Sequence, residues 1–114
     1  SNNLARTARQ LSAEIGETGY THIWYRQRVV RLFHRAQGSA CAICCAAIPL
    51  GAATLDHVVP LAGGGANDLT NFLVTCEPCN REKGDSAPGQ HQLAVHRAVL
   101  NLLLLMEKAD EQGG

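Results

Sequence analysis

Residues 55–61 of this 114-residue chain read LDHVVPL, and residues 76–84 read CEPCNREKG. Three glycines at 63–65 and an asparagine at 71 lie between these two segments. The stretch therefore brings a carboxylate, an imidazole, two carboxamides and a pair of cysteines together in a short length of chain. Side chains of these types bind metal ions and move protons, so the combination is typical of phosphodiester chemistry.

Cysteines form two CxxC pairs, Cys41 with Cys44 and Cys76 with Cys79, separated by 31 residues. Two such turns close a four-coordinate thiolate shell, which predicts a structural zinc ion with no open coordination position. Disulfides and independent buried thiols are the alternatives, although an odd total of five cysteines argues against a complete disulfide framework. Cys45 offers a substitute for Cys44, but the spacing favours Cys44, and we expect Cys45 to be a small buried residue.

Asp56 and His57 end a predicted strand. The ordinary pKa of a histidine lies close to neutral pH, which suits His57 to act as a general base, and a bend at the strand end would let both side chains meet one phosphate. Asn80 follows the second CxxC, and its oxygen with that of Asp56 would suit Mg²⁺ or Mn²⁺. Asn71 is interpreted as bridging the loop and orienting the base. Taken singly, the Asp-His pair is better explained by a structural histidine, and Asn71 could equally be an ordinary turn asparagine.

Apolar periodicity predicts an α+β protein with one domain over residues 1–114. Residues 1–38 are expected to be helical, with one helix around residues 4–15 and a second from about 21 to 36. Residues 39–87 form the zinc-stapled core: strands at 54–59 and 72–75, a loop at 62–68, and a short helix at 78–85. Residues 88–114 hold a long helix from 90 to about 110.

Charge is unevenly distributed although the formal net charge is zero and the pI is about 6.9. Residues 1–35 carry a balance of +4, and the remainder carries −4. The arginines of the second helix would either face phosphate or form an ordinary solvated face; they are Arg26, Arg28, Arg31 and Arg35.

The long C-terminal helix is apolar on more than one face, which is consistent with a homodimer or a protein partner. Its apolar stretch, residues 93–106, is too short and too polar to span a bilayer. Residues 1–9 also lack the apolar run of a signal peptide, so a cytoplasmic protein is expected.

Residues 33–84 resemble the HNH endonucleases, which have the ββα-metal fold. The elements occur in the family's order, and an asparagine at the last motif position makes this an H-N-N variant. The resemblance implies that His57 is the general base and that Asn71 positions it. It implies that Asp56 and Asn80 hold the catalytic divalent ion, which would be Mg²⁺, Mn²⁺ or Ni²⁺. The whole chain is then a single HNH nuclease domain stapled by Zn²⁺.

The same resemblance implies DNA as substrate, double-stranded by expectation, cleaved to 5′-phosphate and 3′-hydroxyl ends. Phosphate contacts are expected from Arg81 and Lys83 on the short helix, and from Arg31 and Arg35. The main alternative is a catalytically silent zinc module that binds DNA or protein, and a second is a dimerisation domain stapled by its cysteines. The other histidines are expected to be structural or to lie on the surface: His22, His34, His91 and His96.

Overall fold

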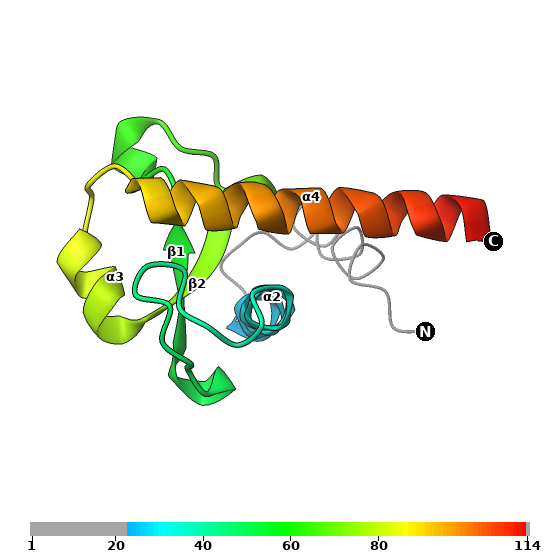
Figure 1. Ribbon diagram of the computed structural model, residues 1–114. Helices are drawn as coiled ribbons and strands as arrows, with labels where there is room; N and C mark the ends of the chain where they lie inside the picture. Colours follow the sequence, from blue (N-terminus) through cyan, green and yellow to red (C-terminus); the bar gives the residue numbers. More distant parts are fainter. Residues whose placement is uncertain (1–22, 114) are drawn as a thin grey trace.

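The computed structural model describes residues 23–113, in which two strands and three α-helices form a small α+β fold. The α+β prediction is confirmed. In chain order the elements are α2 (Ile23–Ala36), β1 (Ala53–His57), β2 (Phe72–Cys76), α3 (Glu77–Lys83) and α4 (Gln90–Gly113) (Figure 1). Three short 3-10 helices occupy Leu50–Ala52, Leu61–Gly63 and Leu69–Asn71. The helix expected around residues 4–15 lies outside the described residues.

The two strands pair antiparallel, from Ala53 opposite Cys76 to His57 opposite Phe72. Helices α2 and α3 both pack against this hairpin. Residues 72–75 are buried throughout, because the strand is covered on both faces. The core draws on α2, the strands, the intervening loops and α4; its buried members include Val29, Leu32, Phe33, Leu55, Val58, Phe72, Leu73, Val74 and Val99.

Strand β1 ends at His57, two residues before the expected end at Val59. Val58 donates its N–H to the backbone oxygen of Asn71 at 2.9 Å, and Val59 donates to the Asn71 side-chain Oδ1 at 2.9 Å. The first bond continues the register of the two strands by one residue, and at Val59 the Asn71 side chain takes the place of a backbone partner. The backbone bends directly after His57, as the proposed convergence of Asp56 and His57 requires.

Gln37 ties the end of α2 to the free edge of β2. Its Nε2 donates to the Val74 oxygen at 2.9 Å, and its Oε1 accepts from the Val74 N–H at 2.7 Å. An unpaired strand edge leaves backbone polar groups without partners. The Gln37 carboxamide satisfies both groups of Val74 and fixes the hairpin to the helix.

Helix α3 begins at Glu77 and ends at Lys83, with Gly84 at φ 51°. Helix α4 crosses the molecule and extends past the other described elements (Figure 1). Its first half contributes buried Val99, whereas Leu104 and Leu105 in its second half are 55% and 65% exposed. The proposed homodimer or partner contact through this helix stays a prediction. No helix among residues 23–113 has the length and apolar character needed to cross a membrane.

Candidate functional site

Asp56, His57 and Asn80 line one cleft of about 200 Å³ at the end of β1. The loop after the strand closes one side of this cleft through residues 60–62, and Gly84 and Asp85 close another. Two expected metal ligands and the expected base thus meet in one hollow. They come from two elements, β1 and α3, that are joined through the β1–β2 hairpin.

Asp56 is buried, and all the side-chain hydrogen bonds that it forms within residues 23–113 are made by one oxygen, Oδ2. This oxygen accepts from Lys83 Nζ at 2.7 Å and from Gln92 Nε2. Oδ1 has no hydrogen-bond partner in the described part of the chain. A buried carboxylate oxygen at a cleft wall is a suitable ligand for a hard cation.

Lys83 also donates to the backbone oxygens of His57 at 2.8 Å and Val58 at 2.9 Å. Its ammonium group therefore has three acceptors, which matches its three donors. The Lys83 and Asp56 side chains are only 7% and 8% exposed. This arrangement does not favour the expected phosphate contact by Lys83, which stays an untested prediction, and it assigns the residue a structural task.

The His57 imidazole packs edge-on against Phe72, with ring centroids 5.1 Å apart. Its Nε2 lies 2.9 Å from Oδ1 of Asn67, a residue that the sequence analysis did not single out. A carboxamide oxygen can only accept, so Nε2 carries the proton of this bond. In the neutral ring the lone pair is then on Nδ1.

Asn71 is buried and uses every polar atom of its carboxamide. Beyond the Val59 N–H contact, its Nδ2 donates to the oxygens of Val59 and Ala66, both at 2.8 Å. Gly65 lies so close that an added Cβ would meet the Val59 oxygen at 1.8 Å. Asn71 thus bridges the loop that follows His57 and acts on that histidine through the backbone.

Asn80 donates from Nδ2 to the Leu55 oxygen at 3.3 Å. This bond attaches α3 to β1 beside the cleft. Like Asp56 Oδ1, the Asn80 carboxamide oxygen has no hydrogen bond within residues 23–113, although it is neutral rather than anionic.

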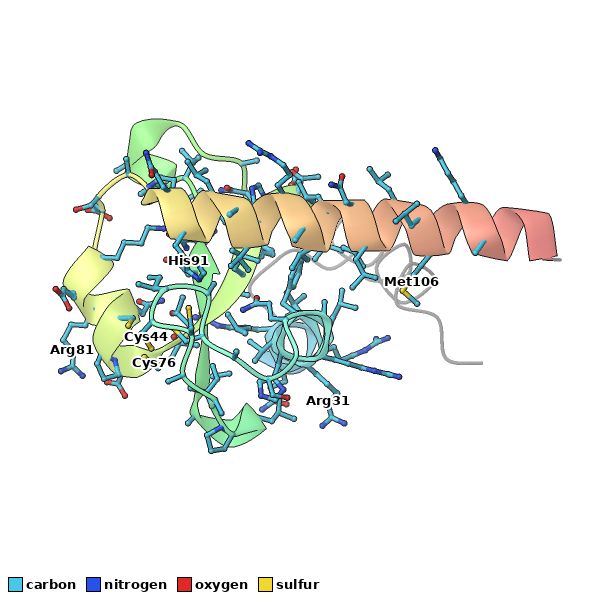
Figure 2. The ribbon with its side chains drawn as sticks, in the orientation of Figure 1. Arg31, Cys44, Cys76, Arg81, His91 and Met106 are labelled. Carbon is cyan, nitrogen blue, oxygen red and sulfur yellow. The ribbon has the colours of Figure 1, made fainter. Side chains whose placement is uncertain are left out.

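The sulfurs of Cys41, Cys44, Cys76 and Cys79 lie within 4.8 Å of one another. The Cys44 and Cys76 side chains lie close together (Figure 2). Their sulfurs are 3.9 Å apart. Tetrahedral zinc with bonds of about 2.3 Å requires sulfur separations of about 3.8 Å, so the cluster fits this ion. Burial raises the pKa of the Cys41 thiol, but N–H groups of Cys44, Cys76 and Ile43 donate to its sulfur and lower the pKa to about 7. A low pKa favours the thiolate that binds metal.

Cys45 lies outside this cluster, as predicted, but it is exposed rather than buried. Its backbone is left-handed at φ 69°, because the chain must turn back at this point, and this directs the side chain outward. The Cys45 sulfur lies 2.9 Å from His91 Nε2 on α4. The expectation of a buried Cys45 was therefore wrong.

The arginines expected to contact DNA lie on two separated surfaces. Arg31 and Arg35 are exposed on α2, and neither forms a hydrogen bond or ion pair within the described residues. Arg31 lines a hollow beside Ala53, at the opposite end of β1 from His57. Arg81 points outward from α3 and pairs with Glu77 (Figure 2).

Comparison with known families gives a match to a model described as HNH endonuclease, over residues 41–92. This segment belongs to the HNH endonuclease family. The matched segment begins at Cys41, the first cysteine of the four-cysteine cluster. It ends at Gln92, so it includes the first residues of α4.

Two relatives of this chain are CRISPR-associated endonucleases named Cas9. The protein of Actinomyces naeslundii is 34% identical over 87 residues, covering 75% of this chain and 8% of the relative. The protein of Corynebacterium diphtheriae is 33% identical over 72 residues, covering 62% of this chain and 6% of the relative. The chain therefore spans less than a tenth of either protein.

The crystal structure of the type II-C Cas9 enzyme from Actinomyces naeslundii is similar in fold. The superposition has a TM-score of 0.52 at 22% identity, covering 86% of this chain and 15% of that one. This likeness supports the ββα arrangement around the HNH cleft.

Sequence reasoning missed three residues at this site: Asn67, Asp85 and Gln92. Asn67 lies in a polar loop ten residues after His57, which is not a spacing typical of any contact. Gln92 had a usable signal: it lies three and seven residues before Val95 and Val99, on the buried stripe of α4. A glutamine at such a position requires a buried partner.

Proposed function

We propose that the chain hydrolyses phosphodiester bonds in DNA as a metal-dependent HNH endonuclease. One observation carries the proposal: Asp56, His57 and Asn80 line the same cleft. The family match over residues 41–92 supports it.

His57 acts as the general base in this proposal and takes a proton from water at Nδ1. Asn67 holds the opposite ring nitrogen, Nε2, and Phe72 limits rotation of the imidazole. Asn71 keeps the following loop, and hence the His57 backbone, in place. General base catalysis of this kind contributes ~10²–10⁴-fold to the rate.

Asp56 Oδ1 and Asn80 Oδ1 are the atoms proposed to hold a divalent ion such as Mg²⁺, Mn²⁺ or Ni²⁺. When bound, the ion would stabilise negative charge on the leaving 3′ oxygen, which implies 5′-phosphate products. The two oxygens are hard ligands and suit these ions.

Zn²⁺ is proposed for the four-cysteine cluster, where its task is structural. All four positions around it are taken by sulfur, so no position remains for water or substrate. The cluster positions α3, because Cys79 directly precedes Asn80 in that helix.

Three exposed arginines, each with a fixed positive charge, are proposed to contact DNA phosphates: Arg31, Arg35 and Arg81. A protein that neutralises phosphates releases counterions when it binds. We therefore expect the DNA affinity to fall steeply with salt, and replacement of any one arginine to reduce the slope by about 1.

Plasmid nicking by the zinc-loaded chain tests the activity. Cleavage should stop with EDTA and return with Mg²⁺, Mn²⁺ or Ni²⁺, and sequencing of the products should give 5′-phosphate ends. His57→Ala should lower the cleavage rate ~10²–10⁴-fold, whereas His91→Ala, outside the cleft, should not. An inert parent protein with every metal would instead indicate a zinc-binding interaction module.

A further inference from the structure

Gln92 belongs to α4, yet its side chain reaches the cleft carboxylate. It is 3% exposed, and its Nε2 donates to Oδ2 of Asp56. A buried carboxamide loses its water contacts, so a residue at this position requires a partner in compensation. An aliphatic side chain would fill the same space against Val95 and Val99 without that cost.

Lys83 alone already neutralises the charge of Asp56. Gln92 is a second hydrogen-bond donor to Asp56, and it donates to the same oxygen, Oδ2, that accepts from Lys83. The terminal torsion of an aspartate is broad and interchanges its two oxygens easily. Two donors that approach one oxygen from different helices remove this freedom.

We infer that Gln92 is a positioning residue of the nuclease site, holding the Asp56 carboxylate with Oδ1 available to a hard divalent cation. The inference rests on the proposed function, because it assigns Asp56 as a ligand. It also makes the first turn of α4 a part of the catalytic centre. Partners that orient a metal ligand in this way typically change affinity or activity 10–100-fold when they are removed.

Mn²⁺ binding to the zinc-loaded full chain tests this inference directly, with free Mn²⁺ followed by electron paramagnetic resonance. Gln92→Met keeps the length and burial of the side chain but removes the donor. It should weaken Mn²⁺ binding ~10–100-fold, and high Mn²⁺ should restore most of the cleavage rate. Asn101→Ala, which removes an exposed carboxamide from the same helix, should bind Mn²⁺ like the parent.

Thermal unfolding of each variant shows whether the fold persists. Should Gln92→Met fail to fold, Gln92→Asn retains the carboxamide but shortens its reach, and it should weaken Mn²⁺ binding similarly. Folded Gln92 variants with Mn²⁺ affinity within twofold of the parent would overturn the inference and leave the nuclease intact. A parent protein that neither binds Mn²⁺ nor cleaves DNA would overturn the proposed function itself.

Discussion

Replacement of Lys83 by methionine should cost this protein a large part of its stability. The substitution keeps the length of the side chain but removes a buried ammonium group from Asp56, 2.7 Å away, and from two backbone oxygens. At an effective dielectric constant of about 20, the attraction across that distance is about 6 kcal/mol, partly offset by desolvation of both charges. Removing one member of a buried pair costs ~3–5 kcal/mol.

A loss of that size is large beside the ~5–15 kcal/mol that stabilises a typical domain. Urea unfolding followed by circular dichroism, with zinc at saturation, measures the difference. Lys108→Met, on the exposed side of α4, is the matched control and should change the unfolding free energy by less than ~0.5 kcal/mol.

The double variant Lys83→Met with Asp56→Leu removes both charges together. It should recover much of the lost stability, because no unpaired buried charge remains. A single Lys83→Met change below about 1 kcal/mol would refute the buried pair. If that small change came with a salt slope of DNA binding reduced by about 1, Lys83 would be a phosphate contact after all.

Three further expectations concern the zinc cluster and the loop. Cys76→Ala should abolish stoichiometric zinc binding and cooperative unfolding, since structural zinc supplies ~10–16 kcal/mol in comparable small sites. Cys45→Ser, the control, should still bind one zinc per chain, as measured by plasma emission spectroscopy. Gly65→Ala should destabilise the loop, because its Cβ would overlap a backbone oxygen, while Gly63→Ala, which has open space, should melt like the parent in calorimetry. Asn71→Leu should lower the unfolding free energy by more than about 2 kcal/mol in urea titrations, since three part-buried hydrogen bonds to the backbone of Val59 and Ala66 are lost.

Elements with a strong local signal were predictable from the sequence. The apolar periodicity and Gly38 predicted the end of α2 at Ala36, and the two CxxC pairs predicted which four sulfurs would meet. Proline and glycine also placed α3 to within two residues at its C-terminal end. These signals depend on neighbours along the chain, which a sequence displays directly.

Contacts between distant residues were not predictable. The strand end at His57 is decided by the carboxamide of Asn71, fourteen residues away, and the place of Lys83 is decided by Asp56, 27 residues away. Because the sequence does not show this contact, the place of Lys83 on a short helix suggested a phosphate contact. Only the packing of α3 and α4 against β1 reveals that its charge lies inside.

Cys79 of the cysteine cluster and Asn80 of the cleft are neighbours in α3, so a single peptide bond separates the two centres at this point. Thiolates are the groups in this chain that oxidants attack most readily, whereas the carboxylate and carboxamides of the cleft are inert to them. Oxidation at the cysteine cluster would therefore displace Asn80 without chemically altering the cleft. We therefore expect the proposed DNA cleavage to require a reducing environment, although no proposed catalytic residue carries sulfur.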